Sequence, residues 1–391
     1  MPAKKTVAVV IERTNGYARE LIRGVADFAA TREDIDFRLL EPETFDPRRD
    51  RYDGYICRVT SRALADRLAR SRRPVVNLLL RWNRPSFASV RPDADAIGAL
   101  AFGHFADRRF RRFAFCGVDS VVYSDLRRDG FLRAAAAHGA KVNCYKTPAA
   151  LRRKYAAHYL IHGSVDTPPD ADDLRKWLLA LEKPVAIFCC DDSRAHQVLN
   201  LCRACGISIP DEAAVLGVDD DPVICTFSSP RLSSMDLNAC GIGFAAAKRL
   251  CGILEGAAPG DPQFLPPKGI SARASTDNYP VDPPWLSDAI GFISHNAVRG
   301  ITAADVFARL KLSHTTVQKA FRRELGSSVQ QEIIRIRLNE AKHLLAETRL
   351  SVTEIAAATG FSGAGYFIHA FTAAEGRSPL AYRRELGASE P

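Results

Sequence analysis

The chain has 391 residues, of which 47% are hydrophobic and 25% charged, and its formal net charge is +9 at pH 7. These values are ordinary for a globular protein and exclude a disordered or collagen-like chain. No apolar run approaches the roughly 20 residues of a membrane-spanning helix, and the N-terminus lacks a secretory cleavage pattern. We therefore expect a cytoplasmic protein of about two to three domains, with no membrane partner.

Short apolar runs alternate with helical stretches through the first two thirds of the chain. The first run, residues 6–11, precedes a helical stretch at residues 17–30. This alternation predicts a mostly parallel, doubly wound α/β fold. The further strands that we predict are residues 55–59, 75–79, 112–116, 157–161, 185–189 and 214–218, with a final strand at 269–272. So many strands need two sheets, which predicts a two-lobed domain over residues 1–275.

Polar residues follow three of these strands, where parallel sheets place their ligands. Carboxylates and arginines form directional hydrogen bonds to hydroxyl groups, and an aromatic ring covers the C–H face of a sugar. The pattern is therefore typical of a polyol-binding cleft. The candidate residues are Glu12, Arg13, Asn15, Tyr17, Asp191, Asp192 and residues 219–221.

Ten cysteines are scattered through this part of the chain. Cys202 and Cys205 form a single C-x-x-C pair with no second pair and no histidine nearby, which is a weak signal for a metal or redox site. We interpret the cysteines as buried thiols and expect no metal and no cofactor.

Residues 276–284 are predicted to be the linker, in a proline-rich stretch that favours an extended, semi-rigid connector. Residues 285–387 follow and are predicted to be all-α. Residues 285–391 carry thirteen Lys and Arg against ten Asp and Glu, a net charge of +3. Bulk charge therefore does not locate a nucleic-acid-binding face.

The same pattern occurs twice in this last part, at about residues 302–325 and 351–375. Each copy has a capping-box pattern and then a serine, Ser313 or Ser362, before a second run of helical periodicity. A helix, a turn and a capped helix make a helix-turn-helix. An amphipathic helix at residues 328–347 is predicted to join the two copies. The alternative is a small helical bundle without a nucleic-acid partner.

The phrases Ser313-His-Thr-Thr-Val-Gln-Lys-Ala-Phe321, Gly360-Phe-Ser362 and Ser378-Pro379-Leu-Ala-Tyr382 resemble the tandem domain of AraC/XylS-type transcription regulators. Ala186-Ile-Phe-Cys-Cys-Asp-Asp192 and Val215-Leu-Gly-Val-Asp-Asp220 resemble the sensor core of LacI/GalR-type repressors, which is similar to periplasmic sugar-binding proteins. A sensor of this type before an AraC-type tail is the arrangement of the D-xylose operon activator family.

The resemblance implies that Arg127 contacts sugar hydroxyls, that Asp191 holds the place of an Asn or Asp ligand, and that Asp219 is the principal carboxylate. The segment from Glu12 to Arg19 varies between sugar specificities, so we assign Glu12, Asn15, Tyr17 and Arg19 to the ligand as well. Asp219 and Asp220 could instead be cap or turn residues, and Arg127 could form an exposed ion pair.

The resemblance also implies that the second helix of each copy enters the DNA major groove. The assigned DNA-contacting residues are His314, Thr315, Gln318, Lys319 and Arg322 in the first copy, and Gly363, Ala364, Tyr366 and His369 in the second. The second helix lacks basic residues, so we expect the first copy to carry most of the specificity.

The function that this predicts is sequence-specific DNA binding and transcription regulation under the control of a small sugar. The resemblance implies an activator of xylose-like pentose catabolism that forms a homodimer and contacts RNA polymerase. Two alternatives stay open. The first is a regulator whose α/β domain is a dimerisation scaffold or binds a non-sugar ligand. The second is a glycoside-acting enzyme, because paired carboxylates serve glycoside hydrolysis; we expect no enzyme, since no nucleophile, metal or phosphate-loop motif is present.

Overall fold

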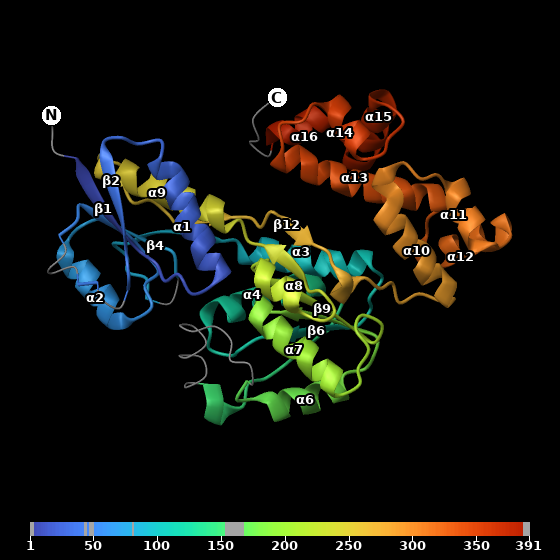
Figure 1. Cartoon of the computed structure of the whole chain (residues 1–391), viewed down its shortest axis with the longest axis horizontal. Coiled ribbons are helices and arrows are strands. Elements are labelled where there is room, and N and C mark those ends of the chain that lie inside the picture. The colour runs from blue at the N-terminus through green and yellow to red at the C-terminus, as the bar shows by residue number, and fades with distance from the viewer. Residues whose placement is uncertain (1–3, 43–44, 47–50, 80–81, 153–167, 386–391) are drawn as a thin grey trace. The chain divides into compact units, whose positions relative to one another are not determined.

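The computed structural model separates the chain into two compact units, residues 1–277 and residues 278–391, each described here by itself. We call them the α/β unit and the helical unit (Figure 1). The residues described are 4–42, 45–46, 51–79, 82–152 and 168–385. Within these ranges, no helix is long and apolar enough to cross a membrane.

A sheet of six parallel strands forms the first lobe of the α/β unit, in the order β11-β5-β4-β3-β1-β2. Side chains alternate between its faces: Val7 and Val9 pack with the helices α1 and α9, whereas Ala8 and Val10 pack with α2. Figure 1 shows α1 and α9 side by side. The elements are β1 (Lys5–Val10), α1 (Gly16–Ala29), β2 (Ile35–Leu40), β3 (Gly54–Cys57), α2 (Arg62–Ser71), β4 (Val75–Asn77), β5 (Ala88–Pro92), α9 (Ala239–Leu254) and β11 (Gln263–Leu265).

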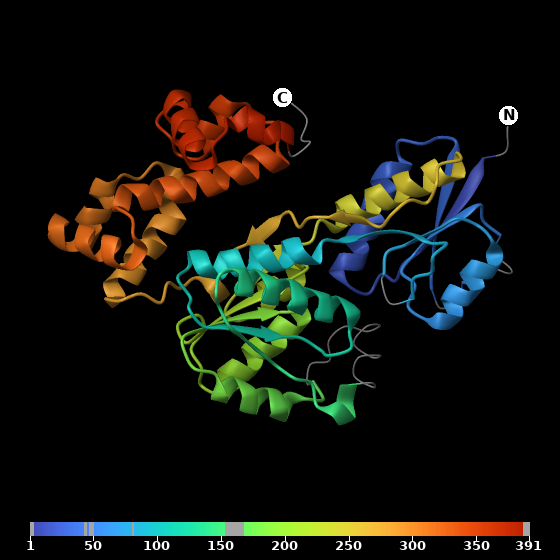
Figure 2. The same ribbon diagram turned by 180° about the vertical axis from the view of Figure 1, so that it is seen from behind.

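A second sheet, in the order β12-β10-β9-β8-β6-β7, forms the second lobe. Its described strands are parallel except β12, which runs antiparallel to β10. Helices α3 and α4 cover one face (Figure 2), and α6, α7 and α8 cover the other. The elements are α3 (Ala94–Asp107), β6 (Phe113–Cys116), α4 (Val122–Ala137), β7 (Val142–Cys144), α6 (Ala171–Ala180), β8 (Val185–Cys189), α7 (Asp192–Ala204), β9 (Ala213–Val218), α8 (Pro222–Phe227), β10 (Ser233–Asp236) and β12 (Gly269–Ser271).

The chain passes between the lobes three times within the described ranges, from β5 to α3, from β10 to α9 and from β11 to β12. The two-lobed, doubly wound α/β fold predicted from the alternation of strands and helices is therefore confirmed. Six of the seven strands predicted before residue 219 correspond to β1, β3, β4, β6, β8 and β9, and the predicted final strand is β12. The predicted strand at residues 157–161 lies outside the described residues.

The prediction missed β2, β5, β7, β10 and β11. The reason is clearest at the sheet edges, where a strand packs against little else. In β2 only the first residue is buried, and β11 has two exposed residues out of three. Such strands lack the apolar run that marks a buried parallel strand in a sequence.

The helical unit consists of seven α-helices in its described part, and the predicted all-α fold is confirmed. The elements are α10 (Pro284–Asn296), α11 (Ala303–Leu310), α12 (His314–Leu325), α13 (Val329–Glu347), α14 (Val352–Ala358), α15 (Ala364–Glu375) and α16 (Pro379–Glu385). One core joins α10, α11 and α12 to the start of α13, and a second joins the rest of α13 to α14, α15 and α16.

The two helix-turn-helix copies have the predicted caps with one exception. Capping boxes open α11, with Thr302 and Asp305, and α14, with Ser351 and Glu354. Ser313 caps α12 by accepting a hydrogen bond from the Thr316 N–H at 3.2 Å. The predicted cap Ser362 is wrong: the N-cap of α15 is Gly363, in extended backbone with φ 174° and no side-chain cap. Helix α12 begins directly after Ser313, whereas α15 begins at Ala364, two residues after Ser362.

The two copies are held together through the middle of α13. Arg337, 6% exposed, donates hydrogen bonds to the carbonyls of Ala297 at 2.8 Å and Ile301 at 2.7 Å, and its guanidinium lies 5.8 Å from the centre of the Phe361 ring. Gly360 (φ 75°) packs so closely that a Cβ there would meet the Ala297 carbonyl at 2.8 Å. One buried side chain and one glycine thus join the second copy to the segment that directly precedes the first.

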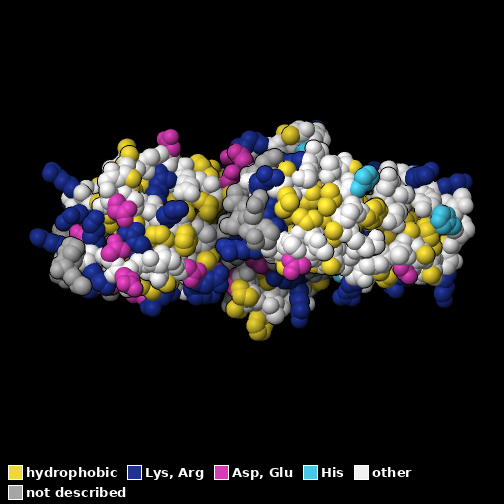
Figure 3. Space-filling model, turned by 90° about the horizontal axis from the view of Figure 1, so that it is seen from above, with side chains coloured by type: hydrophobic (Ala, Val, Ile, Leu, Met, Phe, Trp, Pro, Cys, Tyr) yellow, Lys and Arg dark blue, Asp and Glu magenta, His cyan; other side chains and the backbone are white. Residues whose placement is uncertain are grey.

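Charged side chains are dispersed over one face of the molecule (Figure 3). On the face drawn in Figure 3, Lys and Arg are scattered along the molecule and do not gather into one continuous patch. Charge density on this face therefore points to no particular site.

Candidate functional site

A cavity of about 490 Å³ lies between the two lobes of the α/β unit. It opens at the carboxyl ends of strands from both sheets, where ligands bind in parallel α/β folds. Its first-lobe lining includes Asn15, Tyr17, Arg58, Leu78, Arg91 and Phe264, and its second-lobe lining includes Asp95, Tyr123, Leu126, Arg127, Arg133, Asp191, Ser193 and Asp219.

Arg127 is the central cation of the second-lobe wall. It lies one helical turn after Tyr123 on α4, so both side chains share a face of that helix, and its guanidinium lies 4.9 Å from the centre of the Tyr123 ring. One nitrogen donates to the Cys190 carbonyl, and Nη2 lies 3.5 Å from Oδ1 of Asp219. Arg127 is 6% exposed, so these contacts hold a buried guanidinium at the edge of the cavity.

Asp191 is held from two sides. Its Oδ1 caps α7 by accepting a hydrogen bond from the Arg194 N–H at 2.8 Å, and its Oδ2 accepts one from the Tyr123 hydroxyl at 3.0 Å. A carboxylate with two fixed donors keeps one orientation. Asp191 therefore presents a preset acceptor to the cavity.

Three acidic residues follow β9 in succession, and their backbone is fixed at each step. The N–H groups of Asp219, Asp220 and Asp221 donate to the Met235 carbonyl at 2.9 Å, to Ser234 Oγ at 3.0 Å and to Asp192 Oδ2 at 2.8 Å. Asp219 and Asp220 have positive φ angles of 111° and 49°, a region that Asp enters more easily than most residues. This turn aims Asp219 into the cavity.

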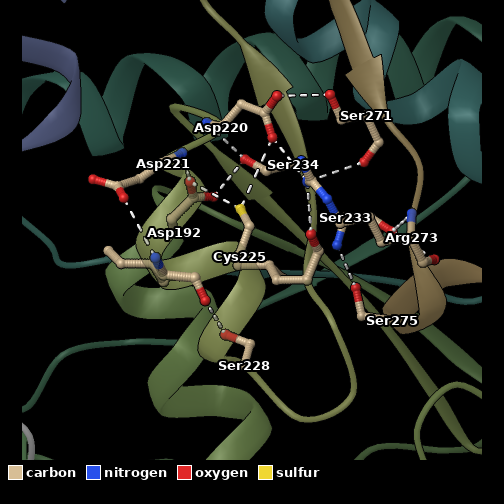
Figure 4. A network of polar contacts seen from close by, with 12 residues as sticks. Asp192, Asp220, Asp221, Cys225, Ser228, Ser233, Ser234, Ser271, Arg273 and Ser275 are labelled. Carbon is tan, nitrogen blue, oxygen red and sulfur yellow. Dashed lines mark hydrogen bonds and ion pairs between the residues drawn. The ribbon is translucent and has the colours of Figure 1, made fainter.

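Figure 4 shows the network behind the turn. Asp220 accepts hydrogen bonds from Ser271 at 2.6 Å and from Arg273 at 2.8 Å, so its carboxylate faces β12. Asp192, 1% exposed, accepts from Ser234, and burial raises its pKa well above the ordinary range. Asp220 and Asp192 are thus used by the fold itself.

Asp219 is the acid after β9 that lines the cavity. It contacts Arg127, but its buried Oδ1 accepts no hydrogen bond from the described residues. Burial raises the pKa of Asp219 to about 7, against the opposing pull of Arg127. A perturbed carboxyl group in a cavity is a common mark of a functional site.

The first-lobe wall supplies an amide, a phenol and an ion pair. The Asn15 side-chain oxygen caps α1 by accepting from the Ala18 N–H at 2.8 Å, which leaves its amide N–H groups for a ligand. Burial raises the pKa of Tyr17, so its phenol stays a neutral O–H donor. Arg58 forms a buried ion pair with Glu12 and lies 5.9 Å from the centre of the Tyr17 ring.

The cavity brings together five of the seven predicted ligand residues, namely Asn15, Tyr17, Arg127, Asp191 and Asp219. Glu12 lies behind the lining as the partner of Arg58. Arg19 does not line the cavity; its half-exposed side chain donates to the Arg13 carbonyl and lies 3.9 Å from Asp221.

Several lining residues were not assigned to the ligand from the sequence, among them Arg58, Arg91, Tyr123 and Phe264. Arg58 follows directly after β3, which ends at Cys57. The predicted strand at residues 55–59 included Arg58, so the rule that selected Glu12 and Asp191 did not reach it. Tyr123 lies one helical turn before Arg127, so the four-residue spacing indicates that the two side chains share a face of the helix. Phe264 belongs to β11, a three-residue edge strand with no signal in the sequence.

The predicted DNA-contacting residues lie on α12 and at the start of α15. His314, Thr315, Lys319 and Arg322 are exposed on α12, and Gln318 is half-buried. The His314 ring packs on Phe307 with 4.1 Å between ring centres. In the second copy, Gly363, Tyr366 and His369 are exposed, Ala364 is half-buried, and Tyr366 packs against the edge of Phe361.

Two known domain families match parts of the two units. Residues 102–276 match the periplasmic binding protein-like domain family, and residues 306–385 match a helix-turn-helix domain family. The xylose operon regulatory protein of Escherichia coli K12 is 25% identical to the chain, with 96% of each protein aligned. The corresponding protein of Haemophilus influenzae is 27% identical, over 76% of this chain and 75% of that one.

The chain is homologous to xylose operon regulatory proteins. In this chain the periplasmic binding protein-like match precedes the helix-turn-helix match. The solved structure of a xylose-binding transcription activator superposes with a TM-score of 0.60 at 24% identity and covers all of both chains. A LacI family regulator from Enterococcus faecalis V583 with bound ribose superposes on 70% of this chain and 98% of its own, with a TM-score of 0.54 and 20% identity.

Proposed function

We propose that this protein is a DNA-binding transcription regulator controlled by a small sugar that binds between the lobes of its α/β unit. The observation that carries the ligand half is the grouping of Asn15, Arg127, Asp191 and Asp219 around one cavity. Together they offer amide and guanidinium donors and two carboxylate acceptors. Neighbouring hydroxyl groups of a sugar both donate and accept, so such a set matches them.

The DNA half rests on the tandem helix-turn-helix arrangement. In each copy a short capped helix precedes a second helix whose outer face is exposed, which suits insertion into the major groove. We propose that Lys319 and Arg322 on α12 read or anchor the operator, and that α15 contributes less because its exposed face carries no Lys or Arg.

The proposed effector, regulatory output and partners are based on the relatives of the chain. Their printed names support a pentose such as xylose as the effector and an activator as the output, with contact to RNA polymerase. We propose a homodimer, since two-fold operators are commonly read by two-fold proteins. Sugar binding acts only to the extent that the sugar prefers the active arrangement of the dimer. We place the protein in the cytoplasm, where its DNA target lies.

Two other functions are less well supported. A pure dimerisation scaffold would fill the space between its lobes with apolar side chains, whereas this cavity has charged walls. The second is a glycoside-acting enzyme. Because the relatives named above are regulatory proteins, we propose no reaction.

Isothermal titration of the purified protein with pentoses, hexoses and their acidic derivatives tests the ligand half. We expect one sugar to bind and both Asp219→Ala and Arg127→Ala to abolish the binding. Circular dichroism of each variant controls for folding. Failure of every sugar to bind would remove the sugar from the proposal and leave the DNA half to be tested by itself.

A further inference from the structure

The cavity has a second polar feature in its first-lobe wall, the guanidinium of Arg91. Arg91 on β5 is the register partner of Phe264 on β11, so the two side chains stand side by side on one face of the sheet. The guanidinium carbon lies 5.1 Å from the centre of the Phe264 ring, and both residues line the cavity. Stacking on an aromatic ring holds the planar donor group of an arginine in place.

Arg91 differs from the other arginines of the lining in its charge balance. Three of them have acidic partners: Arg58 with Glu12, Arg127 with Asp219, and Arg133 with Asp95. Within the described ranges, Arg91 forms no ion pair and its buried Nε makes no hydrogen bond. The remaining acid near it in sequence, Asp93, is used to cap α3 through the N–H groups of Asp95 and Ala96.

An unpaired, half-buried cation is unfavourable for the fold alone. Burial lowers the pKa of Arg91, and no acidic group counters that effect. A guanidinium nevertheless stays charged at neutral pH. A ligand anion would restore the missing balance, and an arginine fork binds a carboxylate or phosphate through two hydrogen bonds.

The cavity has room for such a group. Its volume of about 490 Å³ lies within the roughly 300–1,000 Å³ of sites for drug-sized ligands, a class above a free pentose. Phe264 is 54% exposed and Leu126 38% exposed, so the lining carries apolar surface apart from the Arg127–Asp219 pair. These surfaces suit the C–H face of a larger or extended sugar.

We propose that Arg91 and Phe264 form a subsite for an acidic group of the effector, so that the preferred ligand is a sugar acid or a sugar phosphate and not its neutral parent sugar. This inference rests on the sugar-binding function proposed above. Asp219 and Arg127 hold the hydroxyl groups, and Arg91 selects the charged end.

Matched pairs of ligands test this directly. Titrations compare D-xylose with D-xylonate, D-glucose with D-glucuronate, D-galactose with D-galacturonate, and D-glucose with D-glucose 6-phosphate. We expect one acidic member to bind at least about tenfold more tightly than its parent, as for a charge-assisted hydrogen bond, and the preference to weaken as NaCl rises. The carboxylate and phosphate arms show which anion is preferred.

Variants of Arg91 assign the preference to this residue. Arg91→Gln should bring the acidic and neutral affinities to within about twofold, because it weakens binding of the acidic member; Arg91→Lys should keep part of the preference. Equal binding of acidic and neutral sugars by the unaltered protein, or an unchanged preference in Arg91→Gln, would overturn the subsite and leave the proposed function intact. Absence of binding by every member would overturn both.

Discussion

The carboxylate of Asp221 connects the two lobes directly, because its Oδ2 accepts a hydrogen bond from the backbone N–H of Gly16 at 3.2 Å. The other oxygen caps α8 through the N–H groups of Val223 at 2.9 Å and Ile224 at 3.3 Å. One side chain thus fixes the start of α1 in the first lobe against the start of α8 in the second. The cavity lies beside this contact, since Asn15 and Asp219 are its near neighbours in sequence.

Asp221→Ala should weaken sugar binding as well as stability. Loss of the α8 cap costs about 0.5–2 kcal/mol, and loss of the link between lobes removes preorganisation of the cavity. With a net hydrogen bond worth about 0.5–1.5 kcal/mol, we expect a dissociation constant about 2- to 12-fold higher, measured by titration. Ser61→Ala is the matched control, because Ser61 caps α2 within one lobe; it should lower the unfolding temperature without changing the dissociation constant.

Sugar binding should depend on pH through Asp219. The pKa of this carboxyl is raised to about 7, and the ionised form is the better acceptor for sugar hydroxyls. The affinity for a neutral sugar should therefore rise about tenfold from pH 6 to pH 8, and Asp219→Asn should flatten the profile. A steep profile that survives in Asp219→Asn would assign the titration to another group.

The same shift predicts an effect on stability without ligand. Because the folded pKa lies above the ordinary value of 3.8, protonation of Asp219 favours the folded state, and this contribution is lost as pH rises from about 3.8 through about 7. Asp219→Asn, which mimics the neutral form, should raise the melting temperature at pH 8 more than at pH 5. Calorimetry at the two pH values measures the difference, and an equal change at both would contradict it.

The two helix-turn-helix copies should contribute unequally to DNA binding. Lys319 and Arg322 are exposed on α12, and loss of a base contact costs about 1–3 kcal/mol. We expect Lys319→Ala or Arg322→Ala to weaken binding by that amount and His369→Ala by less, in anisotropy titrations with a fragment selected from a random-sequence library. Arg323→Ala serves as the control, because Arg323 donates to the Asp282 carbonyl at 2.9 Å and contacts Glu324. Equal losses for Arg322 and His369 would refute the asymmetry.

Gly360→Ala should destabilise the helical unit. The left-handed backbone, with φ 75°, costs a residue with a Cβ about 1–2 kcal/mol, and the new Cβ would also meet the Ala297 carbonyl at 2.8 Å. Gly365→Ala is the matched control, since Gly365 lies inside α15 with open space around it; there alanine should stabilise the helix by up to about 1 kcal/mol. Urea unfolding followed by circular dichroism compares the two, and similar midpoints would show that the close contact at Gly360 is relaxed in solution.

Local features of the chain were readable from its sequence. The capping boxes at Thr302 and Ser351 depend on residues three apart, and buried strands such as β8 and β9 are continuous apolar runs because both faces of their sheet are covered. The placement of Asp191 and Asp219 after those strands followed from the rule that parallel sheets present ligands at their carboxyl ends.

Tertiary structure decided the rest, because it depends on contacts between distant segments. Three consecutive acids follow β9, and only the positive φ angles and the partners Ser271 and Arg273 determine that Asp220 turns to β12 while Asp219 faces the cavity. The pairing of Arg91 with Phe264 likewise exists only because the chain returns to the first lobe and adds β11 beside β5. The periodicity of a sequence indicates which side chains of a segment are buried. Which other segment packs beside it depends on the topology of the chain, as when β11 is added next to β5.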